Sequence, residues 1–218
     1  MFYNADGGLT TAGYVLTAVA VFALLILIST LAGKKKTVNA KQLAFAAGAL
    51  ALAIVTSYIK LFHLPMGGSV TLFSMFFVTL IGYWYGPTVG IMAGVAYGLL
   101  QMILDPYIIS LPQMLIDYPF AFGALGLSGL FSEKKNGMII GYIVSVFGRF
   151  VFAVLSGVIF FGMYAPEGMS PLVYSVSYNG AYLAAEAAIT IILLCVPAVK
   201  KALATVKTQA LNLSLIHI

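Results

Sequence analysis

Three charged side chains lie within long apolar stretches of the sequence. Asp117 is the one acid in LIDYPFAF, Arg149 lies in VFGRFVF, and Glu186 lies in YLAAEAAI. Ionisable groups are costly in such surroundings, and where they occur they face a cavity or a partner. We expect a structural ion pair between Arg149 and one acid, which leaves the other carboxylate to meet a ligand or to stay protonated. The pattern predicts a polar binding site inside an apolar protein.

A second polar pattern follows one face of a predicted helix. Asn179, Tyr182 and Glu186 are spaced i, i+3 and i+7, which places them on the same side. Aromatic residues lie close by, since Tyr118 follows Asp117 and Tyr178 precedes Asn179. A belt of aromatic residues at a membrane surface is the simpler explanation for some of them. Carboxylates beside ring faces also suit a flat organic cation, because each ring adds roughly 0.5–2 kcal/mol of cation–π attraction.

Cysteine and histidine are too few for metal or thiol chemistry. The chain has one cysteine, Cys195, and two histidines, His63 and His217, which excludes a disulfide framework and a multi-thiolate metal site. The apolar stretches contain no serine–histidine pair, and the sequence has no GxxxxGK[ST] phosphate-binding loop. We therefore expect no enzyme, no metal and no cofactor, and no ATP binding by that loop.

The composition indicates where these groups reside. Hydrophobic residues make up 62% of the chain and charged residues 8%, whereas soluble domains are about half apolar. The mean hydropathy is +1.06. Several stretches reach the roughly 20 apolar residues that cross a bilayer core as a helix. They are continuous rather than alternating, which favours helices over a barrel. The sequence predicts an all-α integral membrane protein.

Seven stretches are predicted to span the membrane, joined by loops rich in glycine, proline and serine. They cover residues 12–33, 41–61, 70–85, 87–104, 111–132, 138–163 and 178–200. We expect an extra N-terminal transmembrane helix with a basic linker at 1–37, a six-helix membrane domain at 38–205, and a tail at 206–218. The final LSLIHI matches the translation of a common sequencing adapter, so we expect an artefact there, with a short natural tail as the alternative.

Lysine placement predicts the orientation. With strict alternation of the spans, nine of the eleven basic residues fall on one side, and basic residues favour the cytoplasmic side. They are Lys34, Lys35, Lys36, Lys41, Lys134, Lys135, Lys200, Lys201 and Lys207. This arrangement places the N-terminus outside and the C-terminus in the cytoplasm. The run at 13–33 is too long for a cleavable signal peptide and is followed by its lysines, so we interpret it as a membrane anchor.

Two stripes of small residues are spaced for close helix packing. Gly90, Gly94 and Gly98 lie four apart, and ordinary internal packing is the favoured explanation. A second stripe, on the predicted helix at 41–61, combines alanine and glycine. It fits internal packing and a docking surface for another membrane protein equally well. It pairs Ala44 with Gly48, Ala47 with Ala51, and Ala49 with Ala53, and the residues expected to dock are Ala44, Ala47, Gly48 and Ala51.

Several motifs, in order along the chain, resemble those of a known family. They are LPMGGSVTLFSM, GxxAGxxYGLLQ, IDYPFAFGALGLSGLF, GRFVFAVLSGVIFFGMYAPEG and VYSVSYNG. Together the region from about Lys41 to Lys201 resembles the thiamine-specific S components of energy-coupling factor (ECF) vitamin transporters, the ThiT/YuaJ family. The resemblance implies a six-helix binding subunit in a prokaryotic cell membrane, with a vitamin pocket near the outer face. It also implies separate partners, namely a transmembrane coupling subunit and two ATPase subunits, and it favours docking for the alanine stripe.

The resemblance also implies binding roles. Asp117 stands at an acidic pocket position that is glutamate in the best-known relatives. Phe161 stands where a tryptophan is frequent, and Ala153 where a histidine is frequent. Glu186 could compensate for these departures. The resemblance favours thiamine as the ligand, and the departures leave its pyrimidine moiety as an alternative. The predicted binding residues are Asp117, Tyr118, Phe161, Tyr174, Asn179, Tyr182 and Glu186.

A stand-alone carrier coupled to protons is the competing interpretation. In that case Asp117 or Glu186 would titrate during transport. Carriers of this kind are commonly built from inverted repeats with two matched broken helices, and no internal repeat is evident in the sequence.

Overall fold

The computed structural model describes residues 40–211, apart from the side chain of Met66. The predicted span 12–33, the linker lysines and the LSLIHI tail with His217 lie outside the described residues. Within 40–211, five helices are long and apolar enough to cross a membrane, and a shorter apolar helix accompanies them.

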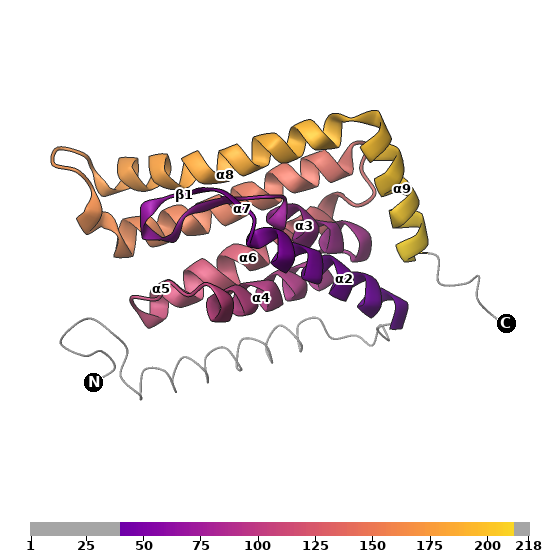
Figure 1. Ribbon diagram of the computed structural model, residues 1–218, viewed down its shortest axis with the longest axis horizontal. Coiled ribbons are helices and arrows are strands. Elements are labelled where there is room, and N and C mark those ends of the chain that lie inside the picture. Colours follow the sequence, from indigo (N-terminus) through magenta and orange to yellow (C-terminus); the bar gives the residue numbers. More distant parts are fainter. Residues whose placement is uncertain (1–39, 212–218) are drawn as a thin grey trace.

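The helices form a bundle that is longest along α7 and α8, which run side by side (Figure 1). Proline at the first position starts both α4 and α8, where its missing N–H is not needed. The regular helices are α2 (Ala40–Ser57), α3 (Ser74–Tyr85), α4 (Pro87–Leu104), α7 (Gly137–Phe160), α8 (Pro171–Cys195) and α9 (Pro197–Leu211). A short turn, η4 (Gly162–Tyr164), precedes α8.

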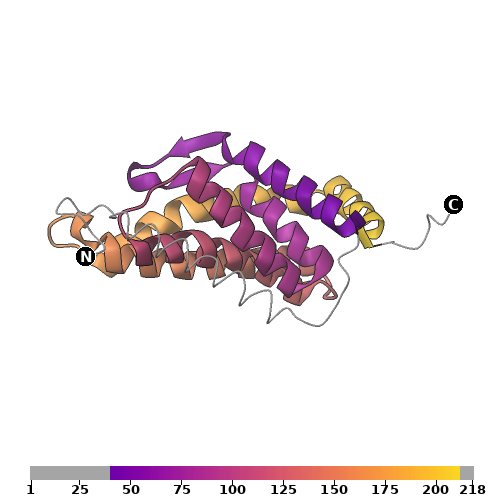
Figure 2. The ribbon, with the colours of Figure 1, turned by 90° about the horizontal axis from the view of Figure 1, so that it is seen from below.

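A β-hairpin replaces the end of the predicted helix 41–61 and the start of the predicted helix 70–85. Strand β1 (Lys60–His63) pairs antiparallel with β2 (Ser69–Thr71). The turn η1 (Pro65–Gly67) joins them, and Gly67 has a φ of +89°, which favours glycine. The helical prediction was wrong here because this turn brings two short strands together. The hairpin projects at one end of the bundle (Figure 2).

The predicted span 111–132 is one continuous but irregular helix. It begins as α5 (Leu111–Leu115), widens into the π-helical turn η2 (Ile116–Phe120), and continues through α6 (Ala121–Gly123) into the 3₁₀ segment η3 (Ala124–Phe131). Pro119 lies inside the π turn and supplies no N–H to it. π turns are rare and occur frequently at functional sites. This one carries Asp117.

The glycine stripe of α4 packs against that irregular helix, as predicted. A Cβ atom on Gly90 would lie 2.8 Å from the Cα atom of Gly126, and one on Gly98 would lie 2.8 Å from the carbonyl carbon of Tyr118. Real Cβ atoms do not approach so closely. The prediction of internal packing is therefore confirmed for this stripe.

The last predicted span, 178–200, differs at both ends. Helix α8 begins at Pro171, because the Ser170 hydroxyl caps it by accepting a 3.3 Å hydrogen bond from the Val173 amide. It ends at Cys195, because Pro197 cannot continue the ladder of hydrogen bonds. Helix α9 then turns away from α8 (Figure 1), so the predicted domain boundary at 205 falls inside it.

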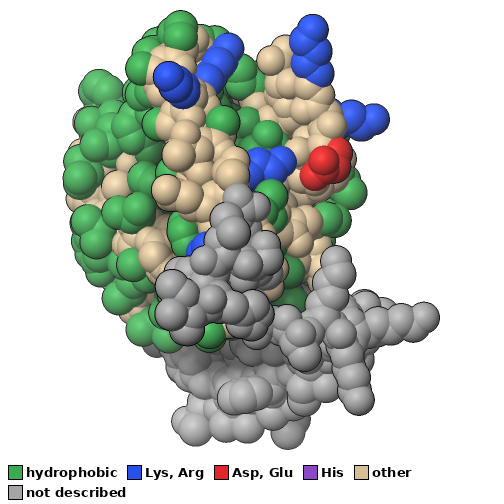
Figure 3. Space-filling view, turned by 90° about the vertical axis from the view of Figure 1, so that its right-hand side faces the viewer, with side chains coloured by type: hydrophobic (Ala, Val, Ile, Leu, Met, Phe, Trp, Pro, Cys, Tyr) green, Lys and Arg blue, Asp and Glu red, His purple; other side chains and the backbone are tan. Residues whose placement is uncertain are grey.

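Helix α9 is fastened to the bundle end opposite the hairpin. The Lys207 ammonium donates a 2.6 Å hydrogen bond to the Ser132 carbonyl and lies 4.2 Å from the centroid of the Tyr83 ring. Lysine side chains gather over this end, with few acids among them (Figure 3). Lys134, Lys135, Lys200 and Lys201 are exposed.

Candidate functional site

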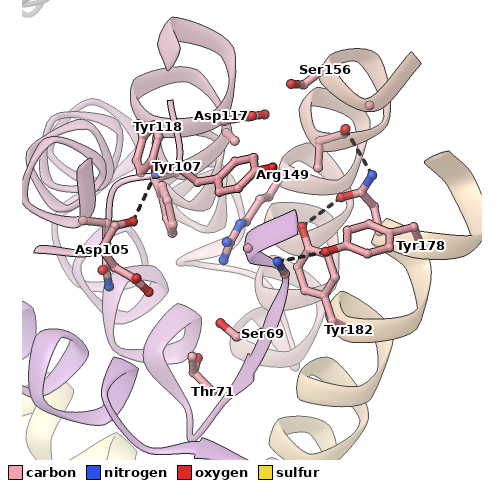
Figure 4. A pocket seen from close by; sticks show the side chains of 18 of the residues that line it. Ser69, Thr71, Asp105, Tyr107, Asp117, Tyr118, Arg149, Ser156, Tyr178 and Tyr182 are labelled. Carbon is pink, nitrogen blue, oxygen red and sulfur yellow. Dashed lines mark hydrogen bonds between the residues drawn. The ribbon is translucent and has the colours of Figure 1, made fainter. Parts of the chain in front are cut away.

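A cavity of about 390 Å³ opens at the hairpin end of the bundle. That volume lies in the usual range for small-molecule sites. Its walls come from the hairpin, the loop at 105–107, the irregular helix, α7 and α8 (Figure 4). All seven predicted binding residues line this one cavity: Asp117, Tyr118, Phe161, Tyr174, Asn179, Tyr182 and Glu186. Their contact with a ligand stays a prediction.

Asp117 is held by its neighbour one helical turn earlier. The amide nitrogen of Gln113 donates a 2.6 Å hydrogen bond to the carboxylate. It also donates a 3.0 Å bond to the Tyr107 carbonyl, while the Gln113 side-chain oxygen accepts a 3.1 Å bond from the Ile109 amide. Gln113 is only 1% exposed. The side-chain amide of Gln113 is therefore fixed, and it orients the Asp117 carboxylate.

Ser156 lies on the Asp117 side of the cavity (Figure 4). Its hydroxyl is buried and has no hydrogen-bond partner among the described residues. Buried polar groups in native proteins are nearly always paired. A ligand group or a water molecule in the cavity would supply the missing partner.

Arg149 forms no ion pair with a carboxylate in the described part of the chain, so the predicted pair with Asp117 or Glu186 was wrong. Its guanidinium instead lies 4.1 Å from the centroid of the Phe122 ring, a cation–π arrangement. The carboxylates of Asp117 and Glu186 accept hydrogen bonds from uncharged donors instead, so neither requires an ion pair with Arg149. The guanidinium projects into the cavity between Asp117 and the hairpin (Figure 4).

One aromatic wall comes from α8. The rings of Tyr174, Tyr178 and Tyr182 follow each other with centroids 6.0 and 5.9 Å apart. The Tyr182 hydroxyl donates a 2.9 Å hydrogen bond to the side-chain oxygen of Asn179. The Asn179 nitrogen donates to the Ala153 carbonyl at 3.2 Å. Asn179 thereby joins α8 to α7 and fixes the ring of Tyr182.

A second aromatic wall faces it. The rings of Tyr107 and Phe161 are stacked, with centroids 5.9 Å apart and an interplanar angle of 29°. The Tyr118 hydroxyl accepts a 2.7 Å hydrogen bond from the Tyr107 amide and donates a 3.2 Å bond to the Asp105 carbonyl. Tyr118 therefore positions this loop while its own ring lines the cavity.

Glu186 is almost completely buried, at 3% exposure, and both of its oxygens accept hydrogen bonds. One oxygen accepts from the Thr71 amide at 3.1 Å and from the Thr71 hydroxyl at 2.7 Å. The other accepts from the Met75 amide at 3.2 Å and from the Ser74 hydroxyl at 3.4 Å. Glu186 thus stabilises the start of α3, where the N–H groups favour negative charge.

The cavity residues that sequence reasoning missed include Gln113, Tyr107, Ser156 and Arg149, which it had assigned to an ion pair. For α7 a signal was present, because Arg149, Ala153 and Ser156 are spaced i, i+4 and i+7 and share one helix face. The role of Gln113 depends on a contact with the loop at 107–109, which no spacing in the sequence indicates.

The predicted docking stripe lies on the outside of α2. All four of its members are exposed: Ala44, Ala47, Gly48 and Ala51. The third predicted pair, Ala49 and Ala53, was wrongly assigned to this surface, because it lies on the opposite face of the helix and is buried in the core. Within residues 40–211 nothing covers these four residues, and their contact with another protein stays a prediction.

Known proteins share this fold and sequence. A family model described as thiamine transporter protein (Thia_YuaJ) matches residues 43–206. The thiamine transporter ThiT of Bacillus subtilis (strain 168) is 34% identical over 163 residues, which cover 68% of this chain and 83% of that protein. The thiamine transporter ThiT of Lacticaseibacillus paracasei is 31% identical over 117 residues, covering 46% of this chain and 58% of that protein.

A solved structure is also similar. ThiT from Listeria monocytogenes matches with a TM-score of 0.59 and 27% sequence identity, over 70% of this chain and 92% of that chain. These matches confirm the resemblance and the all-α membrane fold. The predicted extra helix at 12–33 lies outside both the described residues and the matched region. The relatives are named as transporters, which points away from an enzyme.

Proposed function

We propose, because this chain belongs to the thiamine transporter family, that it binds thiamine in the cavity and acts as the substrate-binding subunit of an ATP-driven importer. Thiamine joins a positively charged thiazolium ring to an aminopyrimidine ring. It therefore needs a carboxylate, flat aromatic surfaces and hydrogen-bond partners, and the cavity contains all three.

The position of Asp117 is the observation that carries this proposal. Its carboxylate is oriented by Gln113 at 2.6 Å and lies at a cavity that two aromatic walls enclose. A charge-assisted contact in such surroundings is stronger than a neutral one. Ring faces add cation–π attraction for the same ligand. We propose contacts from Asp117, Phe161, Tyr174 and Tyr182, with Tyr118 and Asn179 fixing the walls.

The charge distribution supports an outward-facing cavity. The exposed lysines cover the end of the bundle opposite the hairpin (Figure 3). Since lysines favour the cytoplasmic side, the cavity would open to the outside and capture thiamine there. The same orientation would place the C-terminus in the cytoplasm and, with an extra first helix, the N-terminus outside.

Partner subunits would supply the energy for transport. The sequence has no phosphate-binding loop of the GxxxxGK[ST] form. We propose that a transmembrane coupling subunit and two ATPase subunits complete the importer, and that the coupling subunit docks on the exposed stripe of α2. Small residues there allow close helix contact.

Calorimetry on the purified full chain tests the binding step, with thiamine, its phosphates and the free pyrimidine moiety as ligands. Tight binding of thiamine without any ion gradient is expected. A chain that binds none of these ligands would overturn the proposal. Thiamine uptake by liposomes that contain this chain alone, abolished when the proton gradient is collapsed, would support the stand-alone carrier instead.

A further inference from the structure

Glu186 lines the cavity, yet its carboxylate is already occupied by the protein. Four donors from the Thr71–Met75 segment hold its two oxygens at distances between 2.7 and 3.4 Å. A carboxylate with both oxygens engaged in this way has little capacity left for a ligand. The hydrogen bonds of Glu186 therefore hold the segment between β2 and α3.

That segment contains an unfavourable backbone conformation. Phe73, between Thr71 and Ser74, has a φ of +67°, in the left-handed region that side-chain-bearing residues rarely adopt. No side chain caps α3 at Phe73. Glu186 binds the backbone on both sides of this residue, at Thr71 and at Met75. Such conformations persist only where surrounding contacts hold them, and here the carboxylate of Glu186 supplies those contacts.

The hairpin that leads into this segment forms one wall of the cavity. Gly67, Gly68, Ser69 and Thr71 all line it. The backbone lies directly on the α8 aromatic wall, since a Cβ atom on Gly68 would lie 3.1 Å from a ring carbon of Tyr182. The position of the hairpin therefore sets the width of the cavity.

Among the described residues, the hairpin also has polar attachments at its tip and at its start. At its tip, the Tyr178 hydroxyl accepts a 2.9 Å bond from the Gly68 amide and donates to the Pro65 carbonyl. At its start, Lys60 pairs with Asp105 at 2.5 Å, and Asp105 is 56% exposed. Exposed ion pairs contribute little. Much of β1 faces outward, with Phe62 71% exposed. At the base, where Val70 is also buried, Glu186 supplies buried hydrogen bonds.

We propose that Glu186 is a positioning residue that holds the hairpin wall against the occupied cavity, through Thr71 and the first turn of α3, and that it does not itself contact the ligand. The inference rests on the proposed function, since it concerns retention of thiamine in this cavity. Loosening the wall eases the departure of the ligand and leaves its entry unchanged. The rate of dissociation should therefore rise while the rate of association stays the same.

The test measures release of radiolabelled thiamine from the full chain after a chase with unlabelled thiamine, together with the association rate. We expect Glu186→Gln and Thr71→Val each to speed dissociation about tenfold, with association within about twofold of the unaltered chain. Glutamine keeps one acceptor but turns an NH₂ group toward donors, and valine removes the Thr71 hydroxyl. Thr190→Val is the matched control, because the Thr190 hydroxyl donates a 2.9 Å hydrogen bond to the backbone carbonyl of Glu186 and none to its carboxylate among the described residues.

A variant that combines Glu186→Gln with Thr71→Val distinguishes a positioning role of Glu186 from a direct contact with the ligand. If Glu186 acts through Thr71, the combined effect on dissociation is smaller than the product of the two single effects. The same factor should also apply to the free pyrimidine moiety. Multiplicative effects, a slowed association, or a factor that depends on the ligand would overturn the inference in favour of a ligand contact.

Hydrogen exchange adds a readout of the wall itself. Amides at 69–75 should exchange faster in Glu186→Gln, while those of α4 stay unchanged; unchanged exchange at 69–75 would overturn the inference. If Glu186→Gln does not fold, Thr71→Val alone must show the faster release and the faster exchange. An unaltered chain that binds no thiamine would instead contradict the proposed function, so the two failures are distinguishable.

Discussion

Gln113 and Asp117 lie one helical turn apart in an irregular helix and share a 2.6 Å hydrogen bond, with the donor of that bond fixed by the loop at 107–109. The carboxylate therefore has a defined orientation before any ligand arrives. A preorganised acid loses little freedom on binding.

Asp117→Asn should weaken thiamine binding by about tenfold to a hundredfold, because it removes the negative charge and keeps the shape. The Gln113 amide can still donate to the asparagine oxygen, so the midpoint of thermal unfolding should stay nearly the same. Calorimetry measures the affinity. Glu133→Gln, at an exposed acid near the lysine-rich end, is the control. Unchanged affinity in Asp117→Asn would remove Asp117 from the binding site.

Arg149→Met should distinguish phosphorylated from unphosphorylated ligands. The guanidinium projects into the cavity without a carboxylate partner in the described part of the chain. A phosphate group would receive its donors, whereas the thiazolium cation gains nothing from them. We expect the affinity for thiamine phosphates to fall about tenfold more than that for thiamine. An equal loss for both ligands would mean that Arg149 only supports the wall through Phe122.

Gly126→Ala should destabilise the bundle by about 1–3 kcal/mol, the usual cost of overpacking. An added Cβ atom would lie 2.6 Å from the Cα atom of Ile91, where α4 meets the irregular helix. Gly48→Ala is the matched control, because a Cβ atom there would have nothing within 4 Å. Thermal unfolding in detergent measures both. A stable Gly126→Ala variant would contradict the close packing.

Ala47→Leu should separate binding from transport. Ala47 is exposed on α2 and does not line the cavity, so thiamine affinity of the isolated chain should stay unchanged. Uptake by cells that contain the partner subunits should fall at least about tenfold, since a larger side chain prevents close helix contact. Ile192→Leu, at a large exposed residue of α8 and away from α2, is the control. Full uptake by Ala47→Leu would contradict docking at this stripe.

The helix faces could be predicted well from the sequence, and contacts between distant segments could not. Asn179, Tyr182 and Glu186 do share one side of α8 and meet Asp117 at one cavity, because a 3.6-residue period and the family motifs both place them there. KLFH at the start of the hairpin continues an apolar run, and four residues are too few to distinguish a strand from a helix end.

The partners of the three charged groups illustrate the same limit. Glu186 meets residues more than a hundred positions earlier, and Arg149 meets the ring of Phe122 instead of an acid. Both contacts depend on how the helices are arranged in space. The break before α9 could have been predicted from the sequence, since Pro197 interrupts the predicted span 178–200.

The core between the cavity and the lysine-rich end has a consequence for delivery. Two turns beyond the cavity residues on their own helices, Tyr142, Ile81 and Leu194 are at most 1% exposed, and α9 is fastened beneath them by Lys207. The cavity is thus open at the hairpin end and closed by packed side chains toward the lysine-rich end. Among the described residues, a ligand in the cavity therefore meets packed side chains between itself and the lysine-rich end. Import would need the whole bundle to reorient in the bilayer, so that the opening of the cavity faces the other side.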